Sequence, residues 1–309
     1  MENNISNRPS PIRQILLPIL AAVIWGTAFV SQSIVSEYIG PFTFNTLRSV
    51  VASVVLCAVL LIFRTVERAR SVSNDTPRPK ANKKMLVLGA LCCGTALTLA
   101  SNLQQFGISA DTDAGKAGFI TALYIVLVPI MGLCLGKKVT PWVLISVALA
   151  AVGLYFLCID GSFTLARGDI FLIVCAFCFS IHILLIDYFT AYVDGVALSC
   201  GQFMVMTVLS GIFMLIFEHR LTWDMISPCL SQVLYVGIFS SGVAYTLQIL
   251  AQKGSNPTVV SLLLSLESVF ATVAGAIILN ETMSGREYIG CVVMLLAVML
   301  AQIPSKKKK

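Results

Sequence analysis

Long apolar stretches follow one another along almost the whole chain, separated by short polar joints. A helix of about 20 apolar residues crosses the roughly 30 Å hydrocarbon core of a bilayer. Many joints carry residues that begin or end helices, such as Gly40-Pro41 and Asn256-Pro257. The pattern predicts an all-α integral membrane protein with ten transmembrane helices, over residues 15–36, 41–63, 85–108, 114–135, 141–158, 169–189, 195–217, 231–251, 257–279 and 285–303.

The composition is typical of a multi-pass membrane protein. Of the 309 residues, 57% are hydrophobic and 12% are charged, and the mean hydropathy is +0.89. Soluble domains carry about 25% charged residues, so a separate soluble domain is not expected. The longest hydrophilic stretch, residues 64–84, is predicted to be a basic cytoplasmic loop. The fifth predicted helix is the shortest and the eighth the most polar, so either could be a broken helix.

Most of the 21 Lys and Arg residues fall on one side of this topology. With the N-terminus in the cytoplasm, sixteen are cytoplasmic: Arg8, Arg13, Arg64, Arg68, Arg70, Arg78, Lys80, Lys83, Lys84, Lys137, Lys138, Lys253 and Lys306 to Lys309. Basic residues concentrate on the cytoplasmic side of membrane proteins, so we expect both termini in the cytoplasm and the protein in the plasma membrane. The basic loops would contact anionic lipid headgroups. No nucleic-acid partner is expected, because the chain has no folded basic domain.

The two halves of the chain, residues 15–158 and 168–303, repeat the same pattern of helices. A shift of 154 residues aligns the first two helices with the sixth and seventh, and a shift of 144 aligns the third to fifth with the last three. Leu103-Gln104 then matches Leu247-Gln248. Each half has five predicted helices, an odd number, so the second half enters the membrane from the opposite side. Inverted repeats of this kind serve alternating access to a site near the midplane, which favours a transporter.

The sequence also resembles the EamA family of the drug/metabolite transporter superfamily over nearly its whole length. The resemblance is carried by AAVIWGTAFV at 21–30, TLRSVVAS around Arg48, GKAGFITALYIVLVP at 115–129 and LLLSLESVFATVAGAIILNETM at 262–283. The family usually has proline where this chain has Ser268, and often an acidic residue where it has Lys137. The resemblance implies a ten-helix bundle, with each half an EamA-like repeat, that exports or sometimes imports small metabolites without ATP.

One carboxylate, Glu267, lies inside an otherwise apolar predicted helix. A charge at the bilayer centre costs about 2.5–3.5 kcal/mol on insertion scales, so an ionisable residue there suggests function. Glu267 is the eleventh residue of the ninth predicted helix, roughly 15 Å from its start and so near the midplane. Low dielectric favours the neutral acid. Glu267 is therefore expected to carry a coupling proton or to hold a cationic substrate group; the alternative is a structural role that fastens helices.

Two basic residues are further candidates. Arg48 lies about two turns inside the second predicted helix, and its guanidinium can bind a carboxylate or phosphate with two hydrogen bonds. We expect it either to bind a substrate anion or to pair structurally with Glu267. Lys116 begins the fourth predicted helix on the outer side. It is either an interfacial lysine that snorkels to the surface or a cation that steers anionic or zwitterionic substrates.

Polar and aromatic residues inside the predicted helices complete the candidate site. Gln104 and Gln248 occupy equivalent positions in the two halves, so the pseudo-two-fold axis would bring them towards a shared centre. Hydrogen bonds and aromatic surface would come from Asn102, Tyr124, Tyr245 and Trp25. Each residue alone is typical of helix-to-helix hydrogen bonding or packing, but together they suit a mostly apolar pocket with a few polar groups.

No cofactor or metal site is expected. The two histidines, His182 and His219, have no further ligand at metal-binding spacing. Cys175-x-x-Cys178 lies within a predicted helix and has no second pair, so both residues are interpreted as small packing residues. The chain has no phosphate-binding G-x-x-x-x-G-K-[ST] motif and no catalytic set, so neither an ATP-driven pump nor an enzyme is predicted.

These patterns predict a secondary transporter of small polar metabolites such as amino acids, exporting rather than importing, and coupled to protons if Glu267 titrates during transport. Two alternatives stay open. A flippase for lipids or lipid-linked carriers would share the architecture but needs a lateral opening between helices. A non-transporting membrane sensor or assembly protein would show no counterflow of substrate. The sequence is compatible with a monomer or a dimer.

Overall fold

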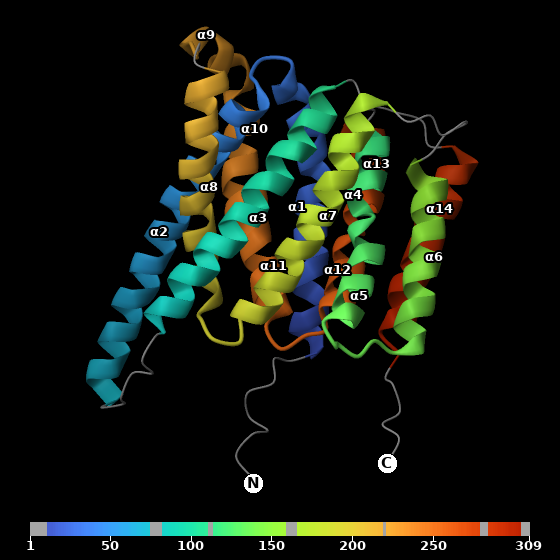
Figure 1. The fold of residues 1–309 in the computed structure, drawn as a ribbon, viewed down its shortest axis with the longest axis horizontal. Helices are drawn as coiled ribbons and strands as arrows, with labels where there is room; N and C mark the ends of the chain where they lie inside the picture. The colour runs from blue at the N-terminus through green and yellow to red at the C-terminus, as the bar shows by residue number, and fades with distance from the viewer. Residues whose placement is uncertain are drawn as a thin grey trace.

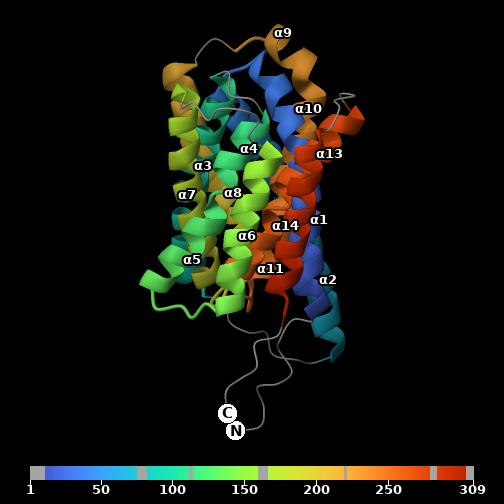
Figure 2. The ribbon, with the colours of Figure 1, turned by 90° about the vertical axis from the view of Figure 1, so that its right-hand side faces the viewer.

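The computed structural model describes residues 11–74, 82–110, 114–158, 166–218, 221–278 and 284–303. Within these segments every regular element is a helix, and the helices lie side by side in one bundle (Figure 1; Figure 2). The predicted all-α fold is confirmed. We call the end of the bundle where α1 begins and α14 ends the terminal face, and the other end the far face (Figure 1).

The bounds of the elements agree closely with the predicted helices. In chain order they are α1 (Pro11–Ser36), α2 (Pro41–Asn74), α3 (Lys83–Ser109), α4 (Ala114–Ala122), α5 (Tyr124–Cys134), α6 (Pro141–Cys158), α7 (Arg167–Phe189), α8 (Gly195–Phe217), α9 (Trp223–Ile226), the 3-10 turn η1 (Ser227–Cys229), α10 (Leu230–Tyr235), the π-helical segment η2 (Val236–Ala244), α11 (Tyr245–Gln252), α12 (Pro257–Leu264), α13 (Glu267–Ile278) and α14 (Gly285–Ala301). The stretch 64–84 was expected to be a loop, but α2 continues as a helix to Asn74. Residues 75–81 of that stretch lie outside the described residues.

Local capping explains several of these bounds. The Asp194 side chain accepts a hydrogen bond of 2.9 Å from the first-turn amide of Ala197 and so starts α8. Ser284 and Glu287 form a reciprocal capping box at the start of α14. The Asn256 side chain caps α12, and Pro257 follows at the first helical position, where its missing N–H costs no hydrogen bond.

Eight helical stretches in the described residues are long and apolar enough to cross a membrane. Helices α6 and α14 are shorter, with 18 and 17 residues, or about 27 Å and 26 Å at 1.5 Å per residue. They pack along each other through two glycines. A Cβ on Gly290 would lie 2.6 Å from the backbone nitrogen of Leu157 and 2.9 Å from the carbonyl oxygen of Gly153. The membrane crossing of α6 and α14, and so the count of ten, stays a prediction.

Two of the predicted helices are broken near their middle. The chain tightens at Leu123, whose amide donates to the Ile120 carbonyl at 3.2 Å, and again at Leu266, whose amide donates to the Leu263 carbonyl at 3.3 Å. Both are three-residue steps typical of a 3-10 turn. The 144-residue shift carries Leu123 onto Glu267, the residue that follows the second break, so the breaks in the two halves lie within two residues of equivalent positions.

The eighth predicted helix is also irregular, because nine residues of it form the π-helical segment η2. A π-helix rotates the residues that follow it and marks functional positions in many proteins. The expectation that polarity hides an irregular helix is therefore confirmed for this element. For the fifth helix the expectation is wrong, since α6 is continuous from Pro141 to Cys158.

Two polar contacts join helices near the ends of the bundle. At the far face, the Glu218 carboxylate after α8 accepts hydrogen bonds from the amides of Phe42 (3.2 Å) and Thr43 (2.7 Å) in the first turn of α2. At the terminal face, Lys137 after α5 forms an ion pair with Asp187 of α7. Helix ends on different parts of the chain are thus fixed to each other by charge.

Candidate functional site

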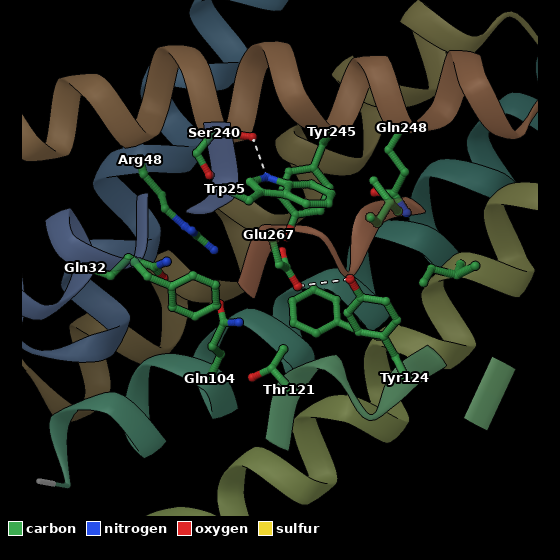
Figure 3. Close-up of a pocket in the computed structure, with 14 residues that line it drawn as sticks. Trp25, Gln32, Arg48, Gln104, Thr121, Tyr124, Ser240, Tyr245, Gln248 and Glu267 are labelled. Atoms are coloured by element: carbon green, nitrogen blue, oxygen red, sulfur yellow. Dashed lines mark hydrogen bonds between the residues drawn. The ribbon is translucent and has the colours of Figure 1, made fainter. Parts of the chain in front are cut away.

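A cavity lies in the middle of the bundle, between the two broken helices (Figure 3). Its lining comes from α1, α2, α3, α4, α5, α7, η2, α11, α12 and α13: Trp25, Phe29, Gln32, Arg48, Gln104, Thr121, Tyr124, Phe179, Ile183, Ser240, Tyr245, Gln248, Leu264 and Glu267. The cavity volume is about 40 Å³, counted as space open to the centre of a water-sized sphere. A water needs about 10–15 Å³ by this measure, so this conformation holds only a few waters.

Arg48 is a buried cation without a counter-ion among the described residues. Its side chain is 2% exposed, and its Nε has no hydrogen-bond partner. The guanidinium lies over the Phe44 ring, 5.3 Å from the centroid, and faces the cavity (Figure 3). Within the described parts of the chain it forms no ion pair within 4.0 Å, so Glu267 is not its salt-bridge partner in this conformation. A buried guanidinium without a counter-ion is costly, and an anion in the cavity would relieve that cost.

Glu267 begins α13 directly after the break and is 5% exposed. Its Oε1 accepts a hydrogen bond of 3.0 Å from the Tyr124 hydroxyl, shown as a dashed line in Figure 3. Tyr124 is the first residue of α5 after the other break. One hydrogen bond therefore connects the two breaks, and it does so at the wall of the cavity.

Aromatic rings form much of the remaining wall. The Trp25 indole donates through Nε1 to the Ser240 carbonyl at 3.2 Å, an oxygen of the π-helical segment η2 (Figure 3). The Trp25 ring also meets Tyr245 edge-on, with centroids 4.8 Å apart. The hydrogen bond and the ring contact fix the orientation of Trp25 in this wall.

Three pairs of lining residues are equivalent in the two halves of the chain: Gln104 with Gln248, Trp25 with Phe179, and Phe29 with Ile183. The cavity therefore lies where the two halves meet. The two ionisable lining residues, Arg48 and Glu267, have no ionisable counterpart in the other half. Position 202, which corresponds to Arg48, is Gln202, and position 123, which corresponds to Glu267, is Leu123.

The structure brings together seven of the nine residues predicted for the site: Glu267, Arg48, Gln104, Gln248, Tyr245, Tyr124 and Trp25. Their role in binding stays a prediction. Asn102 does not line the cavity; its side chain accepts from Asn45 (3.0 Å) and donates to Ser210 (3.1 Å), between α2, α3 and α8. The side chain of Lys116, predicted at the outer mouth, lies outside the described residues.

Several lining residues were not predicted from the sequence, and Gln32 is the most polar of them. Gln32 is 4% exposed, and its Oε1 has no hydrogen-bond partner. It follows Trp25 by seven residues and Phe29 by three, so all three lie on one face of α1. This helical spacing from Trp25 was the feature of the sequence that could have identified Gln32 as a lining residue.

Other chemistry-bearing side chains do not line the cavity. His182 is fully buried, and its Nε2 lies 3.0 Å from Oε1 of Gln202. Cys175 and Cys178 are free thiols. No group of three or more His, Cys, Asp or Glu side chains suited to a metal ion occurs within the described segments.

An apolar groove on the side of the bundle is separate from the cavity. It is lined by α3 and α7: Leu91, Cys92, Thr95, Ala96, Leu99, Cys178, Ile181 and Leu185. The cavity and the groove share no lining residue. Cys178 and Ile181 of α7 line the groove, whereas Phe179 and Ile183 of the same helix line the cavity, so α7 separates the two spaces.

Comparison with known proteins identifies the family. The family model described as the EamA-like transporter family matches the chain twice, over residues 12–159 and 166–302. The chain belongs to the EamA-like transporter family. Like other EamA proteins, it is therefore a multi-pass membrane transporter of the drug/metabolite type.

Several individual proteins are similar to this EamA chain. An uncharacterized transporter of Archaeoglobus fulgidus is 29% identical over 285 residues, which cover 92% of this chain and 84% of the relative. A WAT1-related chloroplastic protein of Arabidopsis thaliana is 25% identical over 297 residues, or 91% of this chain and 67% of the relative. One crystal structure matches with a TM-score of 0.74 at 18% identity, covering 95% of this chain and 97% of that one, and so supports the fold alone.

Proposed function

We propose that this EamA protein is a secondary transporter of the plasma membrane that exports small polar metabolites such as amino acids. One observation carries the proposal: Arg48 and Glu267, buried and not paired with each other, line the same cavity at the centre of the bundle. Groups of opposite charge at that depth suit a polar substrate better than a purely apolar one, because each isolated charge is costly in the membrane.

The two halves of the chain are proposed to expose this cavity alternately to the two sides. The equivalent breaks at Leu123 and at Ser265–Leu266 give each half one interrupted helix beside the cavity. Interrupted helices in inverted repeats surround the substrate sites of many secondary transporters. Movement of one half against the other would widen the cavity beyond its present volume of about 40 Å³.

The terminal face is proposed to be cytoplasmic. The helix joints at this face carry Lys83, Lys84, Lys137, Lys138 and Lys253. Basic residues at short joints favour the cytoplasmic side of the membrane. This orientation puts both chain termini in the cytoplasm.

The flippase alternative is less well supported by the geometry. A lipid substrate needs a lateral path from the bilayer to the polar site, but the apolar groove between α3 and α7 shares no residue with the cavity. Arg48 and Glu267 are therefore not reached from the bilayer through this groove, which favours a water-soluble substrate.

Liposome transport tests the proposal. Purified protein is reconstituted, and uptake of pooled labelled amino acids and metabolites is measured with and without a pH gradient for wild type, Glu267→Gln and the exposed control Glu37→Gln. We expect uptake that follows the gradient in wild type and in the control, and that loses this dependence in Glu267→Gln. Gradient-independent uptake, unchanged in Glu267→Gln, would make the carboxylate structural and the protein a facilitator. No uptake and no counterflow of any compound would favour the non-transporting alternative.

A further inference from the structure

The polar groups of the cavity are distributed unevenly along the axis of the bundle. Arg48 is the eighth residue of α2, about 10 Å from the far-face end of that helix, and Gln248 lies about 6 Å from the terminal-face end of α11. Glu267 lies between them, about 15 Å along from Pro257. Figure 3 shows Arg48 and Gln32 at one end of the cavity and Gln248 at the other, with Glu267 between.

Gln32 lies next to the guanidinium end of the cavity and has an unused side chain. Its amide makes no hydrogen bond to any side chain or backbone group of the described residues, and Oε1 is buried without a partner. Its backbone is fixed, since the Gln32 carbonyl accepts from Nε2 of Gln105 at 3.2 Å. Its Oε1 needs a donor and its Nε2 needs an acceptor, so a ligand that carries both kinds of group, or a ligand together with an ordered water, would complete the hydrogen bonding of this amide.

The chemistry of this end of the cavity selects a single negative charge. A guanidinium binds a carboxylate with two parallel hydrogen bonds, and the amide nitrogen of Gln32 can add a third donor. One guanidinium balances one charge, whereas a dianionic phosphate would bring an unbalanced negative charge towards the Glu267 carboxyl. At Glu267, Oε1 already accepts from Tyr124, and Oε2 has no partner among the described groups. Oε2 is thus available to a cationic donor.

We propose that the cavity binds α-amino monocarboxylates end-on, with the carboxylate held by Arg48 and Gln32 and the ammonium held by Glu267. Gln32 is then a specificity-determining residue that recognises the carboxylate. This inference rests on the proposed transport of small polar metabolites, but it is a statement about binding and is tested by binding.

The decisive variant is Gln32→Glu, which places a fixed carboxylate beside Arg48 and so occupies the anion position with the protein's own charge. We expect this variant to lose binding of amino acids and to gain binding of the corresponding amines, which lack the carboxylate. Gln32→Leu removes the amide without adding a charge and should weaken amino-acid binding by about 10- to 100-fold. Gln232→Glu, in α10 and outside the cavity, controls for the added charge.

The measurement is the thermal stabilisation of each purified variant by each of the twenty standard L-amino acids, by the amine and by the carboxamide of any that stabilises. In wild type and Gln232→Glu, at least one amino acid should raise the melting temperature, and its amine and carboxamide should not. In Gln32→Glu this preference should reverse, which also shows that the variant is folded. The inference is overturned if none of the twenty stabilises wild type, if the amine stabilises wild type as well as the amino acid does, or if Gln32→Glu keeps the wild-type preference.

Counterflow in liposomes with the same compounds separates this inference from the proposed function. Binding with the expected preference but without counterflow supports the recognition by Arg48, Gln32 and Glu267 and overturns transport. Counterflow that does not discriminate between an amino acid and its carboxamide supports transport and overturns the inference.

Discussion

Gly26 sets the distance between α1 and α13 beside the cavity. A Cβ at this position would lie 2.7 Å from Cβ of Phe270, 2.8 Å from the backbone nitrogen of Ala271 and 2.8 Å from the carbonyl oxygen of Glu267. Carbon atoms in contact prefer about 3.5–4.0 Å, so Gly26→Ala would force the two helices apart by roughly 0.7–1 Å. Two of the three atoms belong to the backbone, and a rotamer change cannot remove the clash.

The matched control is Gly211→Ala in α8, where the added Cβ would meet only Cγ2 of Thr46 at 3.7 Å. Both variants gain about 1 kcal/mol of helix propensity, so this gain cancels in their comparison. Overpacking costs about 1–3 kcal/mol, and we expect Gly26→Ala to be less stable than Gly211→Ala by that amount. Because the clash displaces the backbone of Glu267 itself, uptake in liposomes should fall roughly 10- to 100-fold.

The assay is reversible unfolding in mixed micelles by titration with SDS, followed by tryptophan fluorescence, together with liposome uptake for both variants. A Gly26→Ala protein at least as stable as Gly211→Ala would show that α1 and α13 accommodate the added Cβ without strain. Normal stability combined with full uptake would show that α1 and α13 separate freely at this point.

Three further predictions follow from the polar contacts. Tyr124→Phe removes the hydroxyl that donates to Glu267, which should cost about 1–3 kcal/mol of stability in SDS titration and lower substrate-coupled uptake. An unchanged midpoint of SDS unfolding would show that this hydrogen bond does not stabilise the protein. Reversing the charge of Lys137 or Asp187 alone should destabilise the protein by about 1 kcal/mol, and the double charge swap should restore most of it; additive losses would contradict the ion pair. Glu218→Ala leaves first-turn amides of α2 uncapped and should cost about 1–2 kcal/mol, measured by the same titration, while equal stability would show that water replaces the carboxylate.

Helix positions were predictable because their signals are local. Apolar length and turn pairs such as Gly40-Pro41 or Asn256-Pro257 fixed most bounds within a few residues. The breaks were not predictable, because Leu123 and Ser265–Leu266 contain neither glycine nor proline, and the backbone at Leu123 and Ser265 stays in the right-handed region that any residue can adopt. The tertiary packing around the cavity, rather than residue preference, determines where these helices tighten.

The candidate site was predictable where a charge or a repeat position marked it. Arg48 and Glu267 were visible because ionisable residues are rare in apolar helices. Asn102 was assigned wrongly to the lining, since it is two residues from Gln104 and so about 200° away around α3. Gln32 is neither charged nor at a repeat position that stands out, and only its spacing from Trp25 places it on the cavity face of α1.

The contact between α6 and α14 has a consequence for how such a chain could arise. Gly153 of α6 meets Gly290 of α14, and the 144-residue shift converts this pair into Ala297 and Ser146, both fully buried. The same shift carries α6 onto α14, so this contact joins two equivalent helices, as does an isologous contact that two copies of one subunit form across a two-fold axis. A half-length ancestor with a single repeat would therefore bury the same face by forming a homodimer, and joining the two copies in one chain makes that pairing permanent.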